Sequence, residues 1–160
     1  MLFRSEVFIK MVMYNWELQN ERLNSLLGSL SDEQLLNETA PGRNTGIYLL
    51  GHLTAISDAI LPLLGLGEKL YPQLQEPFVN KPDKSGLEFP SIAELKVYWN
   101  QVNATLKNKF GTMQTNDWFN RHMSVSEEDF AKEPHRNKLN ILINRANHQG
   151  YHLGQMAYLK

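Results

Sequence analysis

The stretch NTGIYLLGHLTAISDAILPLL, residues 44–64, decides the fold because it is almost entirely apolar. A helix that is hydrophobic on all sides is buried by its neighbours, so this stretch predicts a helix at the centre of the molecule. Pro62 is expected to bend or end it, since proline lacks the amide hydrogen of a helix interior. His52 lies between Tyr48 and Ile56 on one ridge and is expected to point inward, where each ring nitrogen needs a partner.

Three further segments carry apolar residues at helical spacing, roughly 5–28, 91–110 and 137–159. A capping box opens the second of these segments, and another opens a short helix, SDEQLL, that follows the first. Gly28 and Gly111 are predicted to end the first and third long helices, because glycine commonly terminates helices. No run of alternating apolar and polar residues indicates a β-strand.

Two long connections separate the predicted helices. Residues 65–90 are rich in glycine and proline and contain three aromatic residues. A connection of this length is either a lid or binding loop, or a poorly ordered surface segment. Residues 112–136 are polar and mixed in character. Four long helices with such connections predict an all-α fold, a four-helix bundle with at least one crossover, forming a single domain over residues 1–160.

The composition and charge of the chain exclude several classes of function. Lys and Arg total 16 against 17 Asp and Glu, so no basic excess favours nucleic acid or a membrane surface. The apolar N-terminal stretch is interrupted by Arg4, Glu6 and Lys10, so no signal peptide is recognised and a cytoplasmic location is expected. The chain has no cysteine, which excludes disulfides and protein thiolate nucleophiles. Any transition-metal site must therefore use histidine with carboxylate or water.

A second stretch, NHQGYHLGQM at residues 147–156, places His148 and His152 four residues apart. Residues at this spacing lie on one face of a helix, so both imidazoles can reach the same point. If the central and last helices are neighbours, His52 completes a site of three nitrogens and leaves a fourth position for water or substrate. Two other interpretations stay open: a closed site with a carboxylate as fourth ligand, and histidines that bind no metal.

Neighbouring residues limit this hypothesis. HQGYH lacks the glutamate of H-E-x-x-H metalloproteases, and no histidine has a glutamate three residues before it, as di-iron bundles require. His122 and His135 lie in polar, irregular surroundings and are predicted to be surface residues. Gly150 and Gly154 each weaken a helix by about 1 kcal/mol relative to alanine. They are predicted to let another segment pack closely, or else to leave room beside the metal for substrate.

These motifs resemble those of the DinB-like (YfiT-like) superfamily of metal-dependent enzymes. HQGYHLGQ is similar to that family's H-x-x-x-H-x-G-Q signature, IYLLGHL to the helix with its first metal ligand, and SDEQLL to a short element between its first two helices. The resemblance implies a four-helix bundle in which His52, His148 and His152 bind a divalent ion, commonly zinc or nickel. It also implies frequent dimers, and members that transfer groups to bacillithiol, mycothiol or glutathione.

The favoured hypothesis is a metal-dependent transferase or hydrolase in which the ion activates a thiol or water towards a small-molecule substrate. Because the chain lacks cysteine, the thiol would be a low-molecular-weight cosubstrate. The alternative is a non-catalytic, metal-stabilised bundle that serves as a ligand-binding or interaction module. No general base stands out, since Asp58 is six residues from His52 and faces elsewhere. A homodimer contact could use Trp118, Phe119 and Met123. Three polar residues near the ligands in sequence could support them: Tyr48, Asn147 and Gln155.

Overall fold

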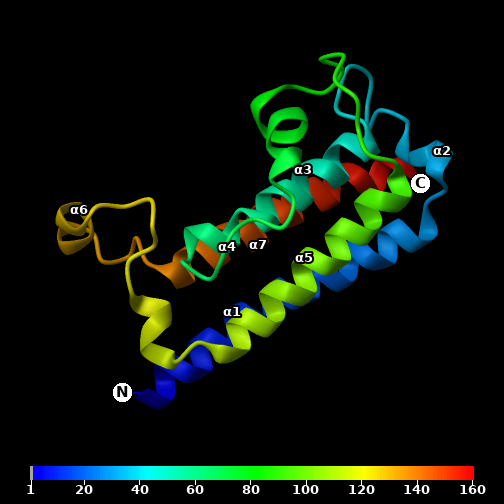
Figure 1. The fold of residues 1–160 in the computed structure, drawn as a ribbon. Helices are drawn as coiled ribbons and strands as arrows, with labels where there is room; N and C mark the ends of the chain where they lie inside the picture. Colours follow the sequence, from blue (N-terminus) through cyan, green and yellow to red (C-terminus); the bar gives the residue numbers. More distant parts are fainter. Residues whose placement is uncertain (1) are drawn as a thin grey trace.

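The structure is a computed structural model that describes residues 2–160, and the secondary structure of these residues is helical (Figure 1). The predicted all-α class is confirmed. The long helices are α1 (Leu2–Ser29), α3 (Gly46–Asp58) with its continuation α4 (Ile60–Leu63), α5 (Ile92–Thr112) and α7 (Lys138–Met156). The shorter elements are α2 (Asp32–Leu35), α6 (Glu127–Lys132), 3-10 turns at Pro72–Leu74, Thr115–Phe119 and Ala157–Leu159, and a π-helical turn at Glu76–Asn80.

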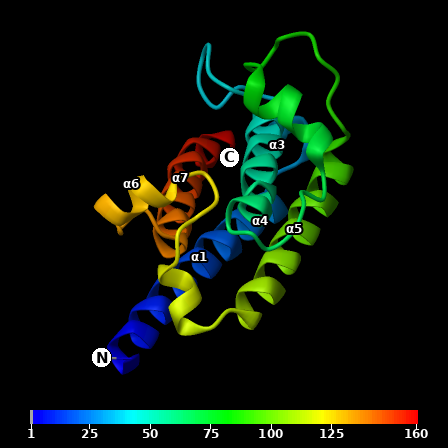
Figure 2. The same ribbon diagram turned by 60° about the vertical axis from the view of Figure 1, so that its left-hand side comes forward.

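The four long helices form a bundle with one crossover. Helices α1 and α7 run in one direction and α3 and α5 in the other, as Figures 1 and 2 show. Helix α3 packs against both α5 and α7, and α1 packs against α7. Because α3 and α5 are parallel neighbours, residues 65–90 must return along the length of the bundle, which is the predicted crossover.

Helix α3 is the most buried of the long helices, as its composition predicts. Leu49, Leu50 and Leu53 are fully buried in the cluster that fills the bundle near the C-terminus of the chain. The segment Gly46–Leu63 is also long and apolar enough to cross a membrane by composition, but 67% of it is buried inside the bundle. A core helix passes the same test, and the burial of this segment accounts for its hydropathy.

The sequence predicted where helices begin more accurately than where they end. The predicted capping boxes at Ser31 and Ser91 are both present. Gly28 and Gly111 do not end their helices, which continue to Ser29 and Thr112. Both predicted stops are wrong because neither glycine adopts the positive φ of a helix-terminating residue. Pro62 lies inside α4, and the helix is interrupted just before it, at Ala59, as expected for a proline bend.

The connection 65–90 is a packed segment. Asp58, at the end of α3, accepts hydrogen bonds from the backbone amides of Leu70 and Tyr71, both at 2.8 Å. Leu74 and Phe78 are fully buried in the core cluster. The expectation of a poorly ordered surface segment is therefore wrong, because this connection contributes side chains to the core and covers one side of α3.

Candidate metal centre

His52 on α3 and His148 and His152 on α7 bring their side chains together between these two helices. The Nε2 atom of His148 lies 3.3 Å from Nε2 of His52 and 3.0 Å from Nε2 of His152. One ligand atom from each residue falls within 4.8 Å of the others. Nitrogens bound to a tetrahedral ion at about 2.0–2.1 Å are about 3.4 Å apart, so the observed spacing suits such an ion.

Two of the three imidazoles are held in a defined orientation by their outer nitrogens. His52 Nδ1 donates to the backbone carbonyl of Phe78 at 2.7 Å. His152 Nδ1 donates to Oε1 of Gln155 at 2.7 Å. A proton on Nδ1 leaves the lone pair on Nε2, so both rings direct an unprotonated nitrogen towards the centre of the cluster. Such outer partners are usual for histidines that bind metals.

His148 shows why a cation fits this cluster better than hydrogen bonds do. Its Nδ1 is buried without a partner among the described residues. Its Nε2 faces two other nitrogens that both carry lone pairs. A single N–H on His148 would serve those two acceptors poorly, whereas one cation accepts all three lone pairs. The donor set therefore fits a divalent transition-metal ion.

The histidines are held in the neutral form that metal binding requires. Burial lowers the pKa of His148 to about 4, and the neighbouring charges of His152, His52 and Arg145 act in the same direction. Burial likewise lowers the pKa of His52 and that of His152, although hydrogen bonds to Phe78 and Gln155 oppose it. At neutral pH these rings are largely unprotonated, so a metal ion would have few protons to displace when it binds.

Arg145 adds a positive charge beside the cluster. It lies three residues before His148 on α7, on the same side of the helix, and it is half-buried. Its buried Nε has no hydrogen-bond partner within the part of the chain that the structure describes. Burial lowers the pKa of Arg145, and its charge lowers the pKa of both His52 and His148. A guanidinium in this position favours an anion at the site.

No carboxylate joins the three histidines within residues 2–160, where they form the group able to hold a metal ion. All three histidines are partly exposed, so the cluster is not sealed from solvent. Asp58 is fully buried and accepts two backbone hydrogen bonds from the 65–90 connection, which confirms that it faces away from the site. This arrangement matches an open metal site better than a closed structural one.

Gly150 and Gly154 of α7 are not sites where another segment packs closely against the helix. A Cβ atom added at Gly154 would meet nothing within 4 Å, and one at Gly150 would only touch Gln19 at 3.6 Å. The predicted close approach is therefore wrong, because α1 comes only to ordinary contact distance of Gly150 and nothing approaches Gly154. Gly154 instead lines a pocket, in agreement with the second interpretation. Close approach occurs on α3, where a Cβ at Gly51 would lie 2.3 Å from the buried ring of Phe78.

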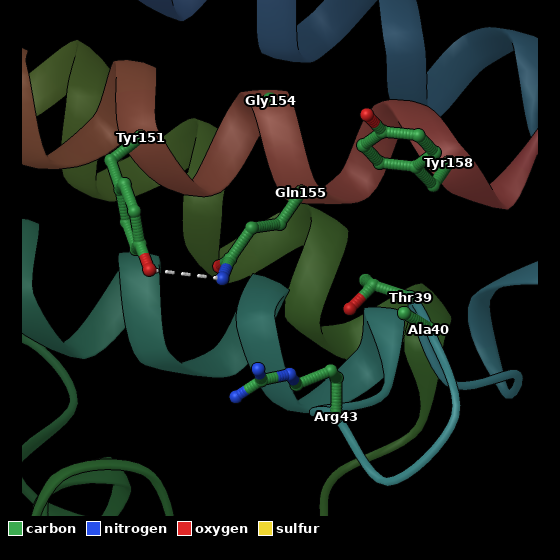
Figure 3. Close-up of a pocket in the computed structure, with 7 residues that line it drawn as sticks. All are labelled: Thr39, Ala40, Arg43, Tyr151, Gly154, Gln155 and Tyr158. Carbon is green, nitrogen blue, oxygen red and sulfur yellow. Dashed lines mark hydrogen bonds between the residues drawn. The ribbon is translucent and has the colours of Figure 1, made fainter.

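A pocket lies beside the C-terminal end of α7 (Figure 3). Its volume is about 480 Å³. Two of its residues also contact His152: Gln155 through the hydrogen bond to Nδ1, and Tyr151 through its ring, whose centroid is 5.1 Å from the imidazole. The residues that line it are Thr39, Ala40, Arg43, Tyr151, Gly154, Gln155 and Tyr158.

The remaining sequence predictions have mixed outcomes. His135 is exposed, as predicted, but His122 is buried, and Nδ1 of its ring lies 3.0 Å from the hydroxyl of Ser124. The surface prediction for His122 is wrong because the 112–136 connection folds over it. Trp118 is covered by the fold, whereas Phe119 and Met123 are exposed. Gln155 supports His152 through its hydrogen bond, and Tyr48 stacks on His52, with the ring centroids 6.2 Å apart, while its hydroxyl donates to the carbonyl of Lys81.

Two contributors to the site were not identified from the sequence. The carbonyl of Phe78 is a backbone atom, so no residue type could have signalled its role. Arg145 could have been found, because it precedes His148 by three residues and therefore shares its face of α7.

Fold and site together define a helical-bundle protein with a three-histidine cluster able to hold a divalent ion. The sequence model of the DinB superfamily matches residues 15–156, and the chain belongs to that superfamily. The resemblance inferred from its motifs is thereby confirmed. The fold is similar to that of a conserved protein from Enterococcus faecalis, with a TM-score of 0.66 at 15% identity, covering 94% of this chain and 93% of the other. Comparison with curated proteins found no match.

Proposed function

We propose that this protein is a metal-dependent enzyme that acts on a small molecule. In this proposal the Nε2 atoms of His52, His148 and His152 bind one divalent transition-metal ion, with zinc and nickel favoured by an all-imidazole donor set. The observation that carries the proposal is the convergence of three Nε2 atoms, two of them oriented by Phe78 and Gln155. No carboxylate belongs to the cluster within residues 2–160, which argues against a closed structural site.

The chemistry follows from an open site of neutral ligands. A bound divalent ion lowers the pKa of water or of a thiol so that a nucleophile is available at neutral pH. The chain has no cysteine, so a thiol nucleophile must come from a low-molecular-weight cosubstrate. Arg145 would stabilise the anionic form of either nucleophile, because its half-buried charge has no acceptor at Nε. Transfer to a thiol or hydrolysis by water are the two reactions that this arrangement supports.

The partners and location remain predictions of this proposal. A small-molecule substrate fits the pocket beside the cluster, whose volume is about 480 Å³. The near-neutral net charge of −1 gives no support for nucleic acid or a membrane surface as a partner. A homodimer and a cytoplasmic location are expectations from family resemblance and from sequence.

The test is elemental analysis of untagged protein purified without added metal, beside a His148→Ala variant. We expect about one zinc, nickel or similar ion per chain, lost in the variant. His135→Ala is the matched control, since this exposed histidine lies outside the cluster and its loss should leave the metal content unchanged. Wild-type protein that stays empty during titration with both zinc and nickel would overturn the proposal.

A further inference from the structure

We infer that the pocket beside the histidine cluster binds the anionic end of the substrate, and that Arg43 is the residue that anchors it. The inference rests on the proposed function and adds a substrate class to it: a small molecule that carries a carboxylate or similar anion some distance from its reacting group. Arg43 is the charged residue among the seven that line the pocket (Figure 3).

The pocket is continuous with the cluster through two residues of α7. Gln155 holds Nδ1 of His152 with its carbonyl oxygen and lines the pocket with the rest of its side chain. The ring of Tyr151 lies edge-on to His152, with the planes 69° apart, and forms another part of the wall. Because Gln155 and Tyr151 both line the pocket and contact His152, a molecule lying along this wall would approach the partly exposed cluster.

Arg43 is available to a ligand because it takes part in none of the ion pairs of the described residues, and the carboxylates of Glu38 and Asp83 are engaged elsewhere. The carboxylate of Glu38 accepts a hydrogen bond from the amide of Gly42 at 2.7 Å and pairs with Lys84. The carboxylate of Asp83 accepts two hydrogen bonds from the residue that caps α3. Within residues 2–160, the guanidinium of Arg43 has neither an ion pair nor a hydrogen bond. Its five donors can therefore meet a carboxylate from the ligand.

The backbone that carries Arg43 is held by a closed turn. The amide of Arg43 donates to the carbonyl of Ala40 at 2.9 Å, which closes a tight turn. Gly42 has a φ of +74°, a conformation that the turn requires and that other residues adopt with strain. A second hydrogen bond, from the amide of Thr39 to the carbonyl of Asn44 at 3.0 Å, closes the loop. The turn therefore fixes where the exposed side chain of Arg43 starts, at the edge of the pocket.

The floor and wall of the pocket suit an anion. A Cβ at Gly154 would meet open space, so the helix surface there is free for a ligand rather than for a packed side chain. The hydroxyl of Tyr151 accepts a hydrogen bond from Nε2 of Gln155 at 3.3 Å. Because the hydroxyl oxygen is the acceptor in that bond, its own proton remains available to donate to a bound carboxylate.

The experiment uses cobalt(II)-loaded protein and two thiols that differ at one end, 6-mercaptohexanoate and 6-mercapto-1-hexanol. Binding is followed by the change in the cobalt absorption spectrum. We expect the acid to bind about tenfold more tightly than the alcohol, since a charge-assisted arginine–carboxylate pair is among the stronger hydrogen-bonded contacts. Arg43→Gln should abolish this preference while leaving cobalt affinity unchanged. Arg4→Gln, near the start of α1 and outside the residues that line the pocket, is the matched control and should keep the preference.

A second measurement separates this inference from the proposed function. Hexanoate, which has no thiol, is titrated into metal-free protein while backbone amide signals are followed by NMR. We expect shifts at Arg43 and Gly154 in the wild type and not in Arg43→Gln. Equal binding of acid and alcohol in protein that does bind cobalt would overturn the inference and leave the metal centre standing. Absence of hexanoate shifts, or shifts at these residues that follow protein concentration alone as in self-association, would overturn it whether or not cobalt binds.

Discussion

Helices α3 and α7 both carry ligands of the candidate metal centre and both contain two glycines, yet the glycines serve opposite purposes. On α3, a Cβ at Gly46 or Gly51 would collide with Leu159, Leu35 or Phe78. On α7, a Cβ at Gly154 would meet open space. The difference teaches that α3 forms the tightly packed side of the site and α7 the accessible side. Glycine spacing in the sequence does not distinguish these two environments.

The groups that orient the histidines show the same contrast, buried for α3 and accessible for α7. His52 on α3 is held by a backbone carbonyl that belongs to a fully buried residue, Phe78. His152 on α7 is held by the side chain of Gln155, which also lines the pocket. Changes on the α3 side should therefore cost stability first, and changes on the α7 side should alter binding first.

The largest effect on stability is expected from Gly51→Ala. The new methyl group would lie 2.3 Å from the ring of Phe78, which is fully buried and has no space to move into. Overpacking of this kind should lower the free energy of unfolding by about 1–3 kcal/mol, measured by urea denaturation. Gly111→Ala on α5 is the control, since its Cβ would meet nothing within 4 Å. Equal stability of the two variants would show that α3 is not tightly packed here.

Gln155→Leu should weaken metal binding with a smaller effect on folding. The variant removes the acceptor for Nδ1 of His152, so the ring is no longer held with Nε2 towards the cluster. Loss of such a partner typically costs about 10–100-fold in metal affinity, which competition with a chelator would measure. Tyr151→Phe is the control, because its hydroxyl contacts only the other end of Gln155. Unchanged zinc affinity in Gln155→Leu would mean that His152 needs no outer partner.

The metal-free protein should lose stability as pH falls from about 6.5 towards 4. The pKa of His148 is lowered from 6.5 to about 4 in the folded chain, so between these values the unfolded chain binds the extra proton. The free energy of unfolding therefore decreases as pH falls through this window. Urea denaturation at pH 7, 5.5 and 4.5 tests this. His148→Ala should show a flatter dependence than His135→Ala, and identical profiles would contradict the assignment.

Gly154→Ala should have the smallest effect and the opposite sign. Alanine is favoured over glycine inside a helix by about 1 kcal/mol, and the added methyl group meets no neighbour. We expect the free energy of unfolding to rise by up to that amount, measured beside Gly150→Ala. A loss of stability would show that Gly154 is a packing glycine after all, and would remove the contrast between α3 and α7.

The sequence was sufficient to predict the features of the structure that follow from the helical spacing of residues. The apolar run at 44–64 predicted a central helix, and the i, i+4 spacing of His148 and His152 predicted their shared face. The convergence with His52 required only that α3 and α7 be neighbours. Capping boxes were read correctly because each is defined by two side chains three residues apart.

Features that depend on tertiary contacts could not be predicted in the same way. Gly28 and Gly111 are residues that commonly end helices, but both keep a helical backbone and each helix ends one residue later, at Ser29 and Thr112. His122 is surrounded by polar residues in sequence, yet the fold buries it, with Ser124 as its hydrogen-bond partner. The role of Gly154 depends on which element covers α7, and the sequence carries no local record of that.

Phe78 couples two roles in a single residue: its ring fills the space that Gly51 leaves, while its carbonyl holds His52. A saturation mutagenesis scan would score position 78 only for hydrophobic volume, because every amino acid supplies the same carbonyl. The contribution to the site is therefore invisible to side-chain genetics. It becomes visible only through backbone chemistry, for example an ester in place of the 78–79 amide, which leaves the ring intact and makes the carbonyl a weaker acceptor.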